Sequence, residues 1–245
     1  DLVMRNARFL LFVLLVSGLP ALSFAQGGKA ADVKASVIRR VVPPEALVME
    51  NMPSIPIEIA EATKKYTEVI PVGGGSWHPV RREMLAVKRA GNVAQVHMLK
   101  TPLGEVKQLT DFPDPVGGGN WEPNSGKYFV FFKATGGNEI AQLHRYDVDS
   151  GTITRLTTND KMRIGGGPWT TAGDRYLYTS VPTGGGTSSE TIKTEFYTID
   201  PANPDSVKLL VALDGVGWGA VEFSPDDKKL VVGKYVSANE SYIYL

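Results

Sequence analysis

The sequence contains no cysteine among its 245 residues. This absence excludes a disulfide-stapled scaffold, a thiolate nucleophile, cysteine-ligated zinc or iron–sulfur centres, and a lipid-modified cysteine behind a signal sequence. Histidine is also scarce, since His78, His97 and His144 are the three present, and they lie far apart without the local spacing of metal ligands. We therefore expect no metal site and no cofactor, and we expect each histidine to have a structural role.

Neither sign of charge is in excess, because 26 Lys and Arg residues balance 26 Asp and Glu residues. No basic stripe stands out, which argues against nucleic acid or an anionic lipid surface as a partner. The 26 glycines and 16 prolines predict many turns, while 42% hydrophobic residues are enough for a folded core. The combination of a folded core and many turns in a chain of this length favours an all-β fold.

The beginning of the chain has the pattern of a secretory signal peptide. Arg5 and Arg8 precede an apolar run over residues 9–16, and small residues at Ser23 and Ala25 follow it. The alternative is an N-terminal membrane anchor, but the apolar run is shorter than the roughly 20 residues that a spanning helix needs. The pattern therefore favours cleavage over anchoring.

We expect residues 1–25 to be a signal peptide that is cleaved after Ala25, with translation starting at Met4. The mature protein is then exported to the periplasm or the extracellular space and keeps no membrane attachment. Residues 26–72 form a lead-in segment, and their closing part at residues 57–66 fits either a short helix or an outer strand.

A fourfold internal repeat begins at residue 73. Each of the first three copies opens with three glycines, one further residue and a tryptophan, and the fourth copy has phenylalanine at the aromatic position. A turn rich in Pro, Asn, Gly or Asp follows each aromatic residue, and an apolar run comes after the turn. The four aromatic residues are Trp77, Trp121, Trp169 and Phe223.

The repeat has the strand pattern of a β-propeller blade. The apolar runs are short and rich in β-branched and aromatic residues, as buried strands are, and further strands follow them across tight turns. The glycine segments are expected at or just before the innermost strand, where backbones crowd. The predicted blades are residues 73–116, 117–164, 165–217 and 218–245, and together they make up a partial propeller over residues 73–245.

Other interpretations of the repeat fit less well. A helical solenoid would show a 3.6-residue periodicity, which these segments lack, and a β-sandwich does not predict the same aromatic residue and turn at each start. A phosphate-binding loop would carry Gly-Lys-Ser or Gly-Lys-Thr, and none follows the glycines. We therefore predict an all-β propeller region of about four blades.

The predicted ring is not closed within the sequence. Propellers close with about four to eight blades of four strands, whereas the fourth repeat stops at its second predicted strand, at Leu245. An apolar strand without a following turn is an exposed sheet edge. We therefore expect a truncated propeller whose remaining sequence lies beyond residue 245.

Several elements in a fixed order resemble the N-terminal propeller of bacterial exported serine peptidases of the prolyl oligopeptidase family, which includes dipeptidyl and acylaminoacyl peptidases. The resemblance covers nearly all of residues 42–245, although the triple glycines depart from it and TolB-like propellers share the Ser-Pro-Asp-x-Lys element. The elements are Trp-His-Pro at 77–79, Leu-Thr at 109–110 and 156–157, Arg-Tyr-Asp at 145–147, Ser-Pro-Asp-Asp-Lys at 224–228 and Ser-Ala-Asn-Glu-Ser at 237–241.

The resemblance implies a propeller that covers a C-terminal α/β-hydrolase domain and restricts its active site to peptides. No Gly-x-Ser-x-Gly nucleophile elbow occurs in these 245 residues, so we assign no catalytic residue. The chain is then expected to gate and position a peptide substrate for a missing catalytic domain. The alternative is a non-catalytic TolB-like propeller that binds a protein or peptide in the cell envelope.

Two carboxylates are candidates for substrate binding at the propeller rim. Glu139 and Glu240 lie in or beside loops between predicted strands, where a carboxylate can meet the amino terminus of a peptide. The alternative for each is a solvated loop residue without a ligand.

Overall fold

The computed structural model describes residues 38–184 and 192–245, and the chain divides into two compact units, residues 1–67 and 68–245. The predicted signal peptide lies outside the described residues. In the first unit, helix α1 (Ile57–Thr67) has Glu58 in its first turn and Lys64 in its last, which suits the helix dipole. The lead-in segment therefore closes with a helix, one of the two structures expected there.

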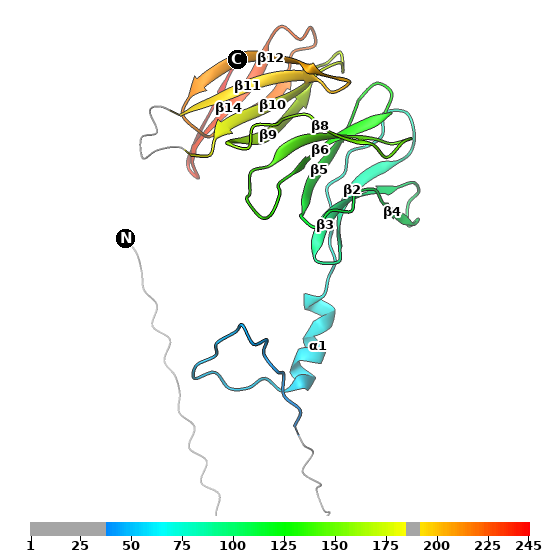
Figure 1. The fold of residues 1–245 in the computed structure, drawn as a ribbon, viewed down its shortest axis with the longest axis vertical. Coiled ribbons are helices and arrows are strands. Elements are labelled where there is room, and N and C mark those ends of the chain that lie inside the picture. The colour runs from blue at the N-terminus through cyan, green and yellow to red at the C-terminus, as the bar shows by residue number, and fades with distance from the viewer. Residues whose placement is uncertain (1–37, 185–191) are drawn as a thin grey trace, which may run out of the picture. The chain divides into compact units, whose positions relative to one another are not determined.

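The second unit contains four antiparallel sheets whose strands follow one another in chain order (Figure 1). We call these sheets blades 1 to 4. Blade 1 has β1 (Val72–Gly73), β2 (Met84–Ala90), β3 (Val93–Leu99) and β4 (Val106–Gln108), and blade 2 has β5 (Val116–Trp121), β6 (Tyr128–Lys133), β7 (Gln142–Asp147) and β8 (Ile153–Arg155). Blade 3 has β9 (Met162–Trp169), β10 (Tyr176–Pro182), β11 (Lys193–Asp200) and β12 (Asn203–Asp214), and blade 4 has β13 (Trp218–Phe223), β14 (Leu230–Ser237) and β15 (Glu240–Tyr244).

This succession of meander sheets is the architecture of a β-propeller region, and the predicted all-β fold is confirmed. The glycine segments of blades 2 and 3 are part of the first strand of each sheet, β5 and β9. In β5 the pairing with β6 shifts register between Gly117 and Asn120, and Gly118 adopts a left-handed φ of 63° there. The first strand therefore contains a bulge at a position that only glycine adopts without strain.

Consecutive blades pack face to face, and we call each interface a seam. In seam 1–2, Leu85 and Val96 of blade 1 share one buried cluster with Trp121, Phe129 and Phe131 of blade 2. Seams 2–3 and 3–4 are built in the same way from the next blades along the chain. Burial of these apolar side chains is the main source of stability for the packed sheets.

The glycines of the first strands allow the seams to close tightly. A Cβ atom on Gly119 would lie 3.1 Å from Leu85 Cδ1 and 3.4 Å from Val96 Cγ1, both in the preceding blade. A Cβ atom on Gly167 would lie 2.5 Å from Leu177 Cδ2 in its own blade and 3.4 Å from the Cβ of Ala220 in the following blade. Close approach to the paired strand of the same blade, and at Gly119 to the preceding blade, therefore accounts for glycine at these positions.

The residue after each repeated aromatic caps the turn between the first and second strands. His78 Nδ1 accepts hydrogen bonds from the backbone N–H groups of Val80 and Arg81, both at 3.0 Å. Burial, with the nearby Arg81 charge, lowers the pKa of His78, so the ring stays neutral and keeps its acceptor nitrogen. Glu122 has the same place in blade 2 and accepts from the backbone N–H groups of residues 124–126.

Neighbouring turns at this end of the blades are joined by polar contacts. The Asp227 carboxylate of blade 4 accepts from the backbone N–H groups of Thr171, at 2.6 Å, and Ala172, at 3.0 Å, in blade 3. Asn124 Nδ2 of blade 2 donates to the Ala172 carbonyl at 2.9 Å. We call this end of the unit the turn end, and its cross-blade bonds hold adjacent blades in register.

A substitution at Gly126 tests how closely the turns of blades 1 and 2 approach each other. Its φ is 63°, and a Cβ atom there would lie 2.2 Å from His78 Nε2. We predict that Gly126→Ala lowers the free energy of unfolding by about 2–4 kcal/mol, because it combines a left-handed backbone with a clash. Urea denaturation followed by tryptophan fluorescence measures the change.

Gly91→Ala is the matched control for this prediction. Gly91 also has a left-handed φ, 61°, but a Cβ atom there would meet no heavy atom within 4 Å. The substitution is expected to cost about 1 kcal/mol from the backbone alone. Equal losses at Gly91 and Gly126 would show that blades 1 and 2 do not make this close contact.

Candidate functional site

The two ends of the blades differ in the regularity of their loops. At the end opposite the turn end, which we call the rim, the described loops between second and third strands include residues 91–92, 134–141 and 238–239. The connectors from one blade to the next reach the same end. Variable loops on a rigid scaffold are where binding residues concentrate, so the rim is the first place to look for a site.

The sequence candidates Glu139 and Glu240 both lie at the rim, on different blades. Glu139 is exposed in the loop between β6 and β7 and has a left-handed φ of 56°. Glu240 is the first residue of β15, is exposed, and accepts a hydrogen bond from the Tyr242 hydroxyl at 2.6 Å. The two residues therefore lie at the same end of the unit, on blades 2 and 4.

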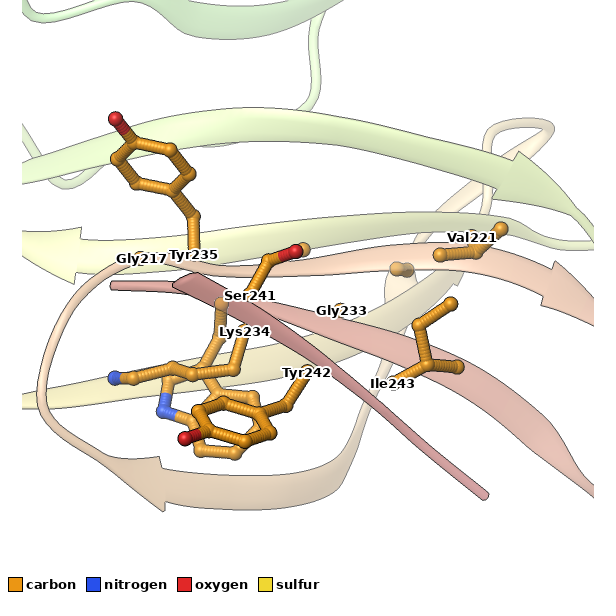
Figure 2. A pocket seen from close by; sticks show the side chains of 11 residues that line it. Gly217, Val221, Gly233, Lys234, Tyr235, Ser241, Tyr242 and Ile243 are labelled. Carbon is orange, nitrogen blue, oxygen red and sulfur yellow. The ribbon is translucent and has the colours of Figure 1, made fainter. Parts of the chain in front are cut away.

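A hollow of about 490 Å³ lies on blade 4 and is drawn in Figure 2. The picture shows Val221 and Ile243 at one end of it and Lys234 and Tyr242 at the other. Ile243 is 78% exposed, whereas Leu143, at the same register position in β7, is 0% exposed within seam 2–3. This surface therefore has the composition of a seam face, and we do not assign it a ligand.

A second cavity, of about 290 Å³, opens within seam 2–3. The connector that leaves blade 2 forms one wall, and strands of blade 3 form the other. We call this cavity the seam pocket. Its polar and aromatic lining consists of Thr157, Thr158, Asn159, Tyr178, Ser180, Glu195 and Tyr197.

The seam pocket exists because seam 2–3 lacks an aromatic residue that fills seam 1–2. Phe112 follows Thr110 by two residues, packs 6.2 Å from the ring of Phe131, and fills the corresponding place in seam 1–2. Asn159 follows Thr157 by the same interval. Thr110 and Thr157 are equivalent, because each hydroxyl oxygen accepts a bond of 2.9 Å from a backbone N–H of the third strand.

The charge of the two seams is also reversed at the rim. In blade 2, the strand register pairs Lys133 with Gln142, and the Lys133 Nζ lies 5.0 Å from the centre of the Phe112 ring. In blade 3, the corresponding pair is Ser180 and Glu195. Ser180 therefore stands where blade 2 has a lysine, and Glu195 stands where blade 2 has a glutamine. The pair carries a positive charge in seam 1–2 and a negative charge beside the open cavity of seam 2–3.

The tyrosines of the pocket are hydrogen-bond donors at neutral pH. Tyr178 and Tyr197 stack with ring centres 5.4 Å apart, and the Tyr197 hydroxyl donates to Glu195 Oε2 at 2.9 Å. Burial raises the pKa of Tyr178 to about 12. Burial, followed by the Glu195 contact, raises the pKa of Tyr197 as well. The pocket therefore combines neutral phenols with one carboxylate, which suits a ligand that carries a positive charge.

The described part of the chain contains neither a metal-holding group of side chains nor a membrane-spanning helix. Among residues 38–184 and 192–245, no group of three His, Asp or Glu side chains is placed to hold a metal ion. No helix in these ranges is long and apolar enough to cross a membrane. His97 and His144 are buried in equivalent third strands, where each Nδ1 lies 3.0 Å from the backbone carbonyl oxygen two residues earlier, of Gln95 and Gln142.

The fold is similar to that of several solved propeller proteins. The structure of TolB from Acinetobacter baumannii has a TM-score of 0.52 and 19% identity, over 71% of this chain and 40% of that chain. A structure from an analysis of two prolyl endopeptidases has a TM-score of 0.51 and 17% identity, over 71% and 28%. An oligogalacturonate lyase in complex with manganese has a TM-score of 0.56 and 11% identity, over 71% and 50%.

At these identities the similarity shows the fold, which is that of a β-propeller region. The chain spans 28–50% of the length of these three structures. No family model and no curated protein matches the sequence.

Sequence analysis alone did not find the seam pocket. Glu195 occurs in a predicted strand with nothing in its local sequence to set it apart. Aligning the repeats by their strand register would have found the site, because Lys133, Gln142 and Phe112 become Ser180, Glu195 and Asn159 in the next blade.

Phe112 and Asn159 allow a direct comparison of the two seams. We predict that Phe112→Ala lowers the free energy of unfolding by about 2–3 kcal/mol, because a ring packed in seam 1–2 is lost. Asn159→Ala is expected to cost no more than about 1 kcal/mol, because among the described residues its side chain accepts one hydrogen bond, from the Lys161 N–H. Chemical denaturation of both variants checks this difference, and equal losses would contradict the open character of seam 2–3.

Proposed function

We propose that this chain is the propeller region of an exported serine peptidase of the prolyl oligopeptidase type. In this role it gates and positions peptide substrates and takes no part in the chemistry. The active serine, the histidine and the acid then belong to a catalytic domain outside these 245 residues. Export to the periplasm or beyond, with cleavage after Ala25, is part of the same proposal.

The observation that carries the proposal is the difference between the two ends of the blades. The turn end is held by cross-blade hydrogen bonds from Asp227 and Asn124, whereas the rim has loops of unequal length. A rigid base with variable loops suits a module that contacts flexible substrates of different sequence. The sequence elements shared with peptidase propellers and the prolyl endopeptidase-like fold support the same function.

The rim offers acidic groups for the amino terminus of a peptide. Glu139 and Glu240 are exposed there, and either can contact a ligand without rearrangement of a buried strand. We keep both as proposed substrate-contact residues. They would act separately, because they lie on different blades.

The alternative function is a non-catalytic, TolB-like propeller that binds a protein or peptide partner in the cell envelope. The fold supports it equally, since TolB from Acinetobacter baumannii is among the similar structures. The rim would then be a docking surface instead of a gate. A serine nucleophile in the native polypeptide distinguishes the two functions.

Labelling of the native protein with a fluorophosphonate probe tests the proposal. Antibodies against residues 68–245 would capture the polypeptide from envelope and secreted fractions of its source, before and after heat denaturation. We predict covalent labelling of the captured, native polypeptide and loss of labelling after heating, because the probe reacts with an activated serine. An intact polypeptide that stays unlabelled, while a control serine peptidase reacts, would refute the peptidase proposal and favour the TolB-like function.

A further inference from the structure

The strand register places a lysine at one rim position in three of the four blades. Lys88 pairs with Gln95 in blade 1, Lys133 with Gln142 in blade 2, and Lys234 with Tyr242 in blade 4. The third blade departs from this pattern, because Ser180 pairs with Glu195.

In two of these blades the lysine ammonium lies over an aromatic ring. Lys133 Nζ is 5.0 Å from the centre of the Phe112 ring, and Lys234 Nζ is 4.6 Å from that of Trp218. The repeat is therefore built to hold an ammonium group beside aromatic side chains at its rim. In seam 2–3 the aromatic pair of Tyr178 and Tyr197 is present, whereas the lysine is not.

Glu195 also has unused capacity as an acceptor. Its Oε2 accepts the Tyr197 hydroxyl, but no hydrogen bond from the described residues uses its Oε1. It takes part in none of the ion pairs within residues 38–184 and 192–245. A half-buried carboxylate in a cavity is most stable with a cation beside it.

We propose that the seam pocket binds a primary ammonium group, with Glu195 as its counter-ion. The ligand ammonium takes the place that the lysine side chain has in blades 1, 2 and 4. The hydroxyl oxygens of Thr158 and Ser180 supply further acceptors, and Leu156, Met162 and Val207 offer apolar surface to a short aliphatic body. The cavity of about 290 Å³ has room for a small amine or for the first residues of a peptide.

The donor set favours an organic ammonium over a metal ion. The pocket has a single carboxylate, and its remaining polar lining consists of hydroxyl groups and one amide. Calcium and magnesium sites usually combine several oxygen ligands with more negative charge. The inference rests on this pocket alone and does not depend on the peptidase proposal.

Isothermal titration of the whole chain tests the inference. The probes are n-butylammonium chloride and alanyl-leucinamide, with n-butanol and N-acetyl-alanyl-leucinamide as their uncharged counterparts. We expect one site per chain for at least one charged probe and no heat from its uncharged counterpart. Binding of n-butylammonium alone points to a free amine as ligand, and binding of the dipeptide amide points to a peptide amino terminus.

Glu195→Gln is the decisive variant, because glutamine already has the equivalent position in blades 1 and 2, at Gln95 and Gln142. It should keep the fold and weaken binding of the charged probe tenfold or more. Glu105→Gln, at an exposed position of blade 1 outside the seam pocket, is the matched control and should bind as the unmodified chain does.

Ser180→Lys gives an independent test, since it restores the lysine of the other blades beside Glu195. We expect this variant to lose binding of the charged probe and to melt at a higher temperature than the unmodified chain. The inference is overturned if neither charged probe binds, or if Glu195→Gln binds as tightly as the unmodified chain.

Discussion

The fold depends on the packing of each blade against the next. A four-stranded meander has two faces, and neither is stable in water when its apolar side chains are exposed. Trp121 shows the effect of a neighbour, since it is 3% exposed within seam 1–2, whereas Trp77, at the equivalent place in blade 1, is 69% exposed. The same aromatic position is therefore buried or exposed according to whether a blade covers it.

The seams also explain how a site arises in a repetitive structure. Every repeat contributes the same strand positions, so a change at one of them alters a single seam and leaves the others unchanged. In seam 2–3 the change from a ring to an amide at Asn159 opens a cavity, and the change to Glu195 places a carboxylate in it. The turn end fixes the position of each blade relative to the next, because Asp227 and Asn124 make hydrogen bonds between adjacent blades.

The sequence predicted the blades because the repeated aromatic residues, turns and apolar runs are local signals at a regular spacing. It also placed the glycines of β5 and β9 near the first strand, although their contacts with Leu85 and Ala220 required the packed neighbour. The sequence did not decide between a helix and a strand over residues 57–66, because a short segment of mixed polarity fits both. Glu195 was missed because the surroundings of its side chain come from Asn159 and Ser180, which are distant in sequence.

The most direct test of this account is a double-mutant cycle across seam 1–2. Leu85 of blade 1 and Phe129 of blade 2 belong to one buried cluster, and both approach the position that a Cβ atom on Gly119 would have. The free energy of unfolding is measured for Leu85→Ala, Phe129→Leu and the double variant. Blade-on-blade packing predicts a coupling energy of about 1 kcal/mol or more, whereas losses that add within about 0.5 kcal/mol would contradict it.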